Sequence, residues 1–250
     1  MIDDGHYARK QLRCPSRVVS WSHGTRFDLA VELAGSDPAG RLLDYGCGDG
    51  TFVAMAHERF AETRGVDAEP GQIADCRQRL GHLRGVSFSL TSDLGSADTG
   101  RWNVVTCMEV LEHCLEGERR RVIAELARLC APGGTVIISV PIETGPSLLG
   151  KQFVRAVAGW RGLGDYAHRE RYSPLEMLRS ILGLPIHRDV HTDIKPAGSF
   201  SFHGHKGFDW RVVEREAGER LAIERRLFSP LRWTGPIVNS QAWLICRRRT

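Results

Sequence analysis

A glycine-rich run with two acidic residues stands between an apolar pair and a helical pattern. It reads Asp44-Tyr45-Gly46-Cys47-Gly48-Asp49-Gly50 and lies between Leu42-Leu43 and residues 51–60. Glycine adopts positive φ and lets a ligand approach the backbone closely, and the free N–H groups at a helix start attract an anionic group. The run therefore predicts a strand-to-helix turn that binds a nucleotide-like ligand carrying a carboxylate.

The spacing of the glycines narrows the class of ligand. The dinucleotide fingerprint is G-x-G-x-x-G, but here the glycines read G-x-G-x-G and Thr51 stands where the third glycine would be. No G-K-[ST] sequence follows that would hold phosphates. The run instead resembles the first motif of the class I S-adenosylmethionine-dependent methyltransferases, and the resemblance extends over about residues 24–140. A glycine-rich turn without a ligand is the alternative.

The resemblance implies contacts between the first motif and S-adenosylmethionine. Asp44 would face the ammonium group at the methionyl end of the cofactor, while Gly46, Cys47 and Gly48 would offer it their backbone. A turn acid or a helix cap is the alternative role for Asp44.

Three later strand ends complete the expected cofactor site. Asp67 and Ala68 follow the second strand, and the Asp67 carboxylate would accept from both ribose hydroxyls, an ordinary strand-end acid being the alternative. Asp93 and Leu94 follow the third strand. The resemblance implies that Asp93 contacts the adenine amino group and that the Leu94 N–H contacts a ring nitrogen, whereas an Asx turn is the alternative. Met108 ends the fourth strand and is expected to line the site.

A second cluster of reactive side chains follows the fourth strand, in Glu109-Val110-Leu111-Glu112-His113. Together with 129–134 (LCAPGG), it resembles the subgroup of ubiquinone-pathway O-methyltransferases and small-RNA terminal-ribose methyltransferases. Two carboxylates and an imidazole suit a divalent cation, which some members of that subgroup hold there, and His168 is the candidate for an additional ligand. The alternatives are His113 as a metal-free general base beside Glu109, a substrate contact, or a packing residue.

The elements that must position these residues alternate between apolar strand and helix patterns. Helices are expected over 24–34, 51–60, 72–80 and 116–129, and strands over 41–45, 65–67, 86–90, 102–107 and 135–140. This alternation predicts an α/β fold: a Rossmann-like, seven-stranded, mostly parallel sheet with helices on both faces. The whole chain, 1–250, is expected to form one domain. Residues 24–140 would form its cofactor-binding core, and residues 207–250 would add a closing helix and antiparallel strands.

Residues 141–206 interrupt the alternation after the fifth strand. They hold an amphipathic stretch, Leu148–Trp160, and a helical pattern over 174–182. A segment of this size on the ligand side predicts a substrate lid, with a membrane-surface contact or core packing as alternatives for the amphipathic stretch. The histidines of this region fit no metal-ligand spacing and are expected at the surface: His187, His191, His203 and His205.

Composition and charge narrow the class of protein and its expected location in the cell. The 250 residues are 42% hydrophobic and 26% charged, no apolar run is long enough to span a membrane, and Met1-Ile2-Asp3-Asp4 does not open like a signal peptide, so a cytoplasmic protein is expected. Seven cysteines without a C-x-x-C pair are interpreted as small buried side chains. The net charge of +4 is mild, although arginine runs occur at 119–121 and 247–249.

Together these features predict an S-adenosylmethionine-dependent methyltransferase that methylates a hydroxyl of a small or lipid-like acceptor. The divalent cation and peripheral membrane contact stay open, as does the oligomeric state. One alternative is an RNA terminal-ribose methyltransferase, which the mild charge makes less favourable. The other is a non-catalytic, membrane-peripheral protein that binds the cofactor.

Overall fold

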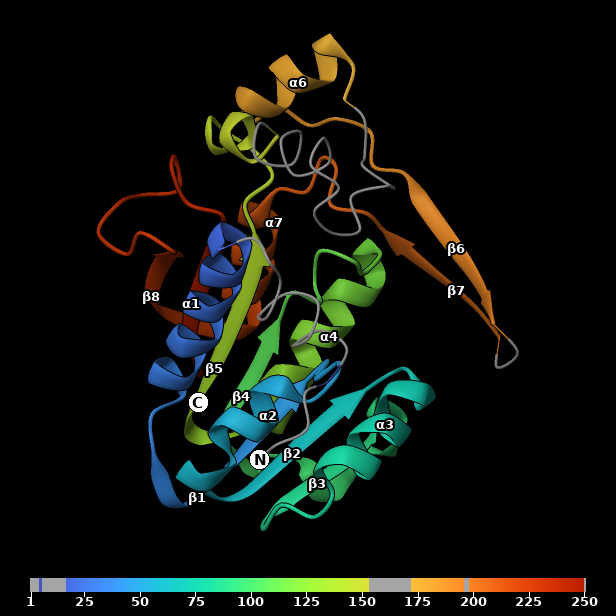
Figure 1. The fold of residues 1–250 in the computed structure, drawn as a ribbon, viewed down its shortest axis with the longest axis vertical. Coiled ribbons are helices and arrows are strands. Elements are labelled where there is room, and N and C mark those ends of the chain that lie inside the picture. Colours follow the sequence, from blue (N-terminus) through green and yellow to red (C-terminus); the bar gives the residue numbers. More distant parts are fainter. Residues whose placement is uncertain (1–4, 6–16, 153–171, 196–197, 250) are drawn as a thin grey trace.

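A seven-stranded sheet with helices on both faces forms the centre of the molecule (Figure 1). The structure, a computed structural model, describes residues 5, 17–152, 172–195 and 198–249. The elements of the first part of the chain are α1 (Arg17–Ala34), β1 (Asp37–Tyr45), α2 (Thr51–Ala56), β2 (Phe60–Asp67), α3 (Pro70–Leu80), β3 (Val86–Leu90), β4 (Trp102–Met108), α4 (Glu116–Leu129) and β5 (Cys130–Pro141). The later elements are α6 (Pro174–Ile181), β6 (Val190–Lys195), β7 (Gly198–His203), α7 (Trp210–Arg220), β8 (Leu221–Ser229) and β9 (Gln241–Arg248).

The strand order of the large sheet is β3-β2-β1-β4-β5-β9-β8. Strands β1 to β5 pair in parallel, and β9 runs antiparallel to both β5 and β8. The mostly parallel sheet is therefore confirmed. Its order reverses between β1 and β4, and in such sheets ligands bind beyond the carboxyl ends of the strands at that point. The runs that begin at Asp44 and Glu109 lie there.

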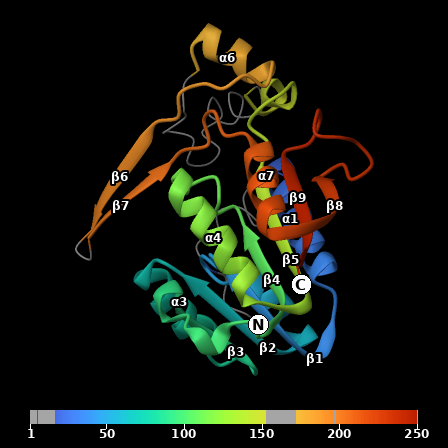
Figure 2. The same ribbon diagram turned by 180° about the vertical axis from the view of Figure 1, so that it is seen from behind.

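The layers follow from two-sided burial of the strands. Residues Val136 to Val140 in β5 are buried, as a parallel strand covered on both faces requires. Helix α4 buries Val122, Ile123 and Leu126, and shares one apolar cluster with α7. Helices α1 and α2 share a second cluster on the opposite face, and α3 packs with α2 near β3. Figure 2, seen from behind, shows α4 and α7 in front of the sheet.

The observed elements depart from expectation in three places. Strand β2 spans eight residues and begins at Phe60, because the α-helical part of α2 ends at Ala56 and a short 3₁₀ turn leads directly into the strand. Helix α1 begins at Arg17, seven residues before the expected start. The region 141–206 contains an unexpected antiparallel hairpin, β6–β7, which projects away from the large sheet (Figure 1).

The predicted lid lies only partly within the described residues. Leu148 is fully buried and Leu149 is 52% exposed, whereas residues 153–171, including most of the amphipathic stretch and His168, lie outside them. The six described cysteines are all buried and free, which confirms the interpretation made for them. None of the described helices is long and apolar enough to cross a membrane.

Candidate active site

The turn between β1 and α2 depends on its glycines. Gly46 and Gly48 have φ of 79° and 51°, in the left-handed region that favours glycine. A Cβ on Gly46 would lie 2.3 Å from Cγ2 of Val110, whereas a Cβ on Gly48 would meet no atom within 4 Å. Gly46 therefore permits close packing against the loop after β4, and Gly48 leaves open space beside its own backbone.

Asp44 is a buried acid at the end of β1. Its side chain accepts a hydrogen bond from Oγ1 of Thr106 at 2.7 Å, and the residue is 2% exposed. Burial is the main cause that raises the pKa of Asp44 to about 7; the charge of Asp67 adds to the shift and the Thr106 hydrogen bond opposes it. No basic side chain contributes to this shift. A cation bound beside Asp44 would therefore stabilise its carboxylate.

Asp67 connects two loops at the end of β2. Its Oδ2 accepts the N–H of Gly48 at 2.9 Å, and its Oδ1 accepts the N–H of Glu69 at 2.9 Å. Each carboxylate oxygen has a second lone pair, so the group keeps the capacity to accept from a ligand.

A cavity of about 270 Å³ opens beside this turn. It is lined by five residues predicted to bind the cofactor (Asp44, Gly46, Cys47, Gly48 and Met108) and by Glu109. Further lining residues, which the sequence had not indicated, are Arg26, Phe27, Asp49, Thr51, Phe52 and Gln72. Arg26 and Phe27 come from α1, and no short motif around them marked that helix as part of the site.

Besides Asp67, three predicted cofactor residues do not line this cavity. Ala68 and Asp93 are exposed, and Leu94 packs against the apolar cluster around α4. The Asp93 carboxylate accepts the N–H of Leu90 at 3.0 Å, a contact back to the residue that caps the short 3₁₀ turn 91–93, rather than the Asx turn named as its alternative role. The contacts of these residues with adenine and ribose stay predictions.

Glu109 adopts a strained conformation directly after β4. Its φ of 55° is the only positive value among the described non-glycine residues. The side chain lies 3.4 Å from Nη1 of Arg26 and accepts from Oγ of Ser139 at 3.3 Å. Its N–H also donates to the Ser139 carbonyl at 3.0 Å. A non-glycine residue in this region costs of order 1–3 kcal/mol and persists only where surrounding contacts hold it, commonly at functional sites.

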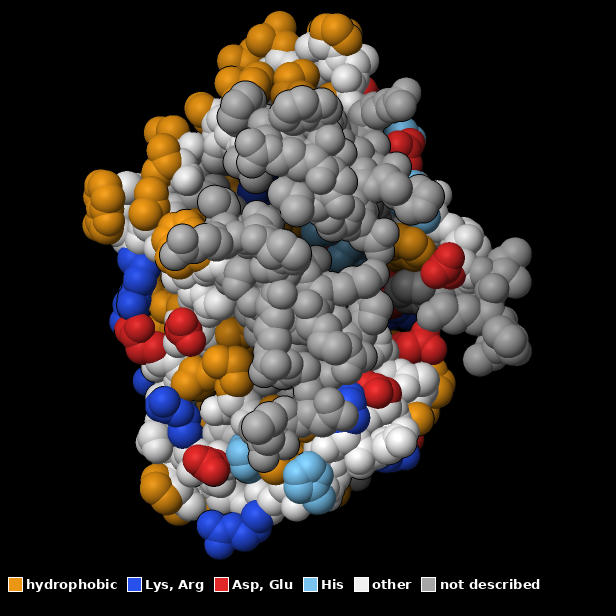
Figure 3. All heavy atoms as spheres, in the orientation of Figure 1, with side chains coloured by type: hydrophobic (Ala, Val, Ile, Leu, Met, Phe, Trp, Pro, Cys, Tyr) orange, Lys and Arg blue, Asp and Glu red, His pale blue; other side chains and the backbone are white. Residues whose placement is uncertain are grey.

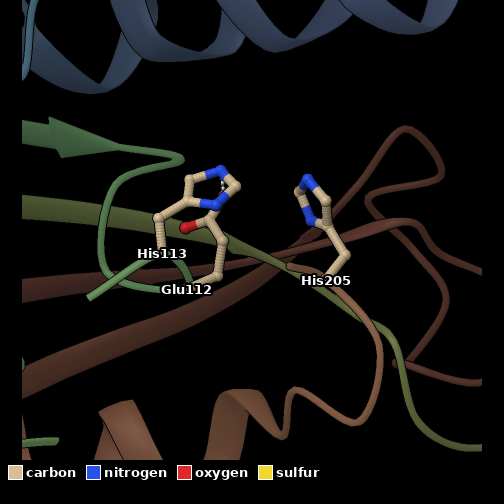
Figure 4. A group of neighbouring side chains, drawn as sticks. All are labelled: Glu112, His113 and His205. Atoms are coloured by element: carbon tan, nitrogen blue, oxygen red, sulfur yellow. Dashed lines mark ion pairs between the residues drawn. The ribbon is translucent and has the colours of Figure 1, made fainter. Parts of the chain in front are cut away.

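Glu112, His113 and His205 form a cluster at the same end of the sheet (Figure 4). One ligand atom from each lies within 4.8 Å of the others. Glu112 is fully buried and neither of its carboxylate oxygens has a hydrogen-bond partner in the described chain. Burial, with the Glu109 charge as the next cause, raises the pKa of Glu112 well above its ordinary value. Nε2 of His113 lies 3.7 Å from Oε1 of Glu112.

The histidines of 187–205 divide into two groups. His187 and His191 are exposed, as expected. The surface expectation is wrong for His203 and His205, which are partly buried, and the His205 ring meets the His113 ring edge-on with centroids 4.9 Å apart. Because ninety-two residues separate His113 from His205, spacing gave no signal of this contact.

Comparison with known proteins agrees with this geometry. A family model described as "Methyltransferase domain" matches residues 21–182. A ubiquinone biosynthesis O-methyltransferase from Thiobacillus denitrificans is 32% identical over 159 residues, which cover 61% of this chain and 65% of that protein. The chain spans about three fifths of the length of the curated relatives that it matches.

Two solved structures share the fold at low sequence identity. The PH0226 protein from Pyrococcus horikoshii superposes with a TM-score of 0.62 at 16% identity, covering 99% of this chain and 100% of that one. The N-methyltransferase NodS from Bradyrhizobium japonicum, in complex with S-adenosyl-L-homocysteine, gives 0.55 at 13% identity over 97% and 96% of the two chains. With the family model matching well over half of its residues, the chain belongs to the methyltransferase-domain family.

Proposed function

We propose that the protein transfers the methyl group of S-adenosylmethionine to a hydroxyl group of a small, lipid-like acceptor. The observation that carries this proposal is the cavity beside Gly48, with the buried Asp44 carboxyl at its wall. The ammonium group of the cofactor would supply the positive charge that Asp44 needs. Asp67, joined to the same turn through the Gly48 N–H, would accept from the ribose hydroxyls.

The protein's part in the reaction is alignment and proton removal. When bound, S-adenosylmethionine would supply a methyl group that the acceptor oxygen can attack, with the C–S bond broken and the sulfur released as a neutral thioether. Holding oxygen, carbon and sulfur in line can supply ~7–11 kcal/mol. The hydroxyl proton passes to Nε2 of His113, a general-base contribution of about 10²–10⁴ in rate. Glu109, held by Arg26 and Ser139, would orient the acceptor or the cofactor's reactive end.

The same residues also fit a divalent cation. Glu112 presents two buried oxygens without hydrogen-bond partners, and His113 and His205 offer ring nitrogens beside it. Glu109 is a further candidate ligand, and His168 lies outside the described residues. Carboxylate and imidazole donors suit Mg²⁺, Mn²⁺ or Zn²⁺, which when bound would polarise the acceptor oxygen.

The nature of the acceptor is inferred from the relatives and from the charge distribution. Curated relatives are named ubiquinone biosynthesis O-methyltransferases, which favours a hydroxylated, lipid-like ring. The arginine runs that motivated an RNA acceptor are engaged within the fold. Arg119 and Arg120 pair with Glu216, and Arg247 pairs with Glu224. These pairs leave less free positive charge for phosphates, which favours the small acceptor.

Peripheral contact with lipid is part of this proposal. Leu175 and Leu178 of helix α6 and Leu182, which caps it, are 54–65% exposed, and Leu149 is also exposed. Figure 3 shows hydrophobic side chains gathered at the end of the molecule where Figure 1 places α6. Such a surface would suit an enzyme that takes its acceptor from a membrane.

Isothermal titration calorimetry with S-adenosylmethionine tests the cofactor assignment directly. We expect micromolar binding to the wild type, weakened about 10- to 1,000-fold by Asp67→Ala, because a charge-assisted pair of hydrogen bonds is lost. Asp37→Ala is the matched control, since Asp37 is an exposed acid at the opposite end of β1 that accepts only a local backbone N–H. Absence of binding, or preference for NAD, would refute the proposal.

A further inference from the structure

The end of the β6–β7 hairpin holds His113 by two backbone contacts. The N–H of His203 donates to the His113 carbonyl at 2.9 Å, and Nδ1 of His113 lies 3.0 Å from the His203 carbonyl oxygen. A carbonyl oxygen only accepts hydrogen bonds, so Nδ1 must carry the hydrogen of this contact. In the neutral ring, Nε2 is then the bare nitrogen, and it faces the Glu112 carboxyl.

A single arginine ties this hairpin end to the loop after β4. Nη2 of Arg188 donates to the carbonyl of Glu112 at 2.6 Å and to the carbonyl of Gly204 at 2.9 Å. It thereby joins the residue before His113 to the residue after His203. The guanidinium also lies over the Phe208 ring, 5.1 Å from its centroid.

The Arg188 bridge supports the Nδ1 contact indirectly, because it joins the residue before His113 to the residue after His203 without contacting the ring. Loss of the bridge should loosen the Nδ1 contact and allow the ring to exchange its two neutral forms. A fixed hydrogen on one ring nitrogen determines which nitrogen is available to a substrate or a metal.

We propose that Arg188 is a positioning residue of the methyl-transfer site, which keeps His113 in the form with hydrogen on Nδ1 and a bare Nε2 beside Glu112. The proposal deepens the proposed function and rests on it. It applies equally to an Nε2 that takes the acceptor's proton and to one that binds a cation, since both need that nitrogen bare.

The first measurement uses the wild-type protein treated with a chelator. In alkaline buffer, ¹⁵N–¹H spectra of the histidine rings should show a hydrogen on Nδ1 of His113 and none on Nε2. The His113 signals are identified by their loss in His113→Gln. A ring with hydrogen on Nε2, or an equal mixture of the two forms, would overturn the proposal without any reference to Arg188 variants.

The second measurement compares three variants. Arg188→Met keeps a long apolar side chain over Phe208 but loses the hydrogen bonds to the Glu112 and Gly204 carbonyls. We expect a mixture of the two His113 forms in this variant. Arg188→Lys places one nitrogen that can reach both carbonyls and should restore the wild-type spectrum. Arg179→Met is the matched control, because Arg179 also donates twice to a backbone carbonyl of the neighbouring segment, that of Pro185, but does not contact the loop of His113.

Kinetics separate positioning from general damage. With a prenylated hydroxyphenol as the acceptor probe, Arg188→Met should lower kcat about 10- to 100-fold, the usual cost of losing such support. The Kd of Arg188→Met for S-adenosylmethionine should differ from the wild-type value by less than about threefold. The same limit should hold for the Kd of Arg179→Met. A wild-type His113 spectrum in Arg188→Met would overturn the role of Arg188. Failure of cofactor binding in the wild type would instead refute the proposed function, which keeps the two outcomes distinct.

Discussion

Asp44 shows how a residue proposed to bind the cofactor can lower the stability of the free protein. Its carboxyl is buried, accepts one hydrogen bond from Thr106, and has a pKa raised to about 7. The folded state therefore binds more protons at Asp44 than the unfolded state between the unfolded pKa of about 4 and pH 7. The stabilising contribution of this group is present below about pH 4 and is lost as pH rises through 7.

Replacing Asp44 by Asn should reveal this cost. The amide oxygen can still accept from Thr106, but the buried charge is gone. Without ligand, we expect Asp44→Asn to be more stable than the wild type near pH 8 by on the order of 1–3 kcal/mol, and this advantage to be smaller near pH 5 and to vanish only near pH 4. Thermal unfolding at the two pH values measures the difference.

Asp98→Asn is the control for that experiment. Asp98 is also buried but pairs with Arg64 at 3.1 Å, so loss of its charge should destabilise the protein at both pH values. S-adenosylmethionine should stabilise the wild type and leave Asp44→Asn almost unchanged. If S-adenosylmethionine stabilised Asp44→Asn as much as it stabilises the wild type, the proposed role of Asp44 would be contradicted.

At the scale of elements, the turn between β1 and α2 combines two uses of glycine. Gly46 serves packing, because a side chain there would collide with Val110. Gly48 faces open space, which the proposed contact with the cofactor requires. The hairpin β6–β7 also contributes to the site, because the backbone carbonyl of its last residue, His203, contacts the His113 ring.

Gly48→Ala should distinguish the cost of backbone strain from the loss of space for the cofactor. The substitution places a Cβ at positive φ, which costs about 1–2 kcal/mol, and it fills space beside the cofactor turn. Gly35→Ala is the matched control, with φ of 72° and likewise no atom within 4 Å. Chemical denaturation should show similar stability losses for both variants, whereas calorimetry should show weakened cofactor binding only for Gly48→Ala. Equal cofactor affinity in the two variants would argue against a ligand at Gly48.

For the whole molecule, the exposed leucines of α6 lie toward the end of the sheet where the site opens. We expect the wild type to sediment with vesicles of phosphatidylglycerol and phosphatidylethanolamine. The double variant Leu175→Asp, Leu178→Asp should remain in the supernatant, because charged side chains resist burial in lipid. Val190→Asp, on the exposed hairpin, is the control that should still sediment. A wild type that stays in the supernatant would rule out the membrane contact.

Sequence-based prediction succeeded for elements whose formation depends on residues close together in the sequence. The alternating apolar runs identified β1, β3, β4, β5, α3 and α4, since burial on both faces dictates a continuous apolar strand. It was incomplete where polar residues interrupt a run, as in β2, whose first five residues include Glu62 and Arg64. The hairpin was missed because β6 carries polar residues on most positions and rests on pairing with β7.

By itself, the sequence determined the turn around Gly46 and Gly48, because glycine is strongly favoured at those backbone angles, and the acidic ends of the strands that surround it. It also placed Glu109, Glu112 and His113 after the fourth strand. Only the tertiary structure decided that Arg26 and Phe27 line the cavity, that His205 meets His113, and that Arg188 bridges two loops. These contacts join residues distant along the chain, and their geometry is set by how the helices and the hairpin pack around the sheet rather than by any local pattern.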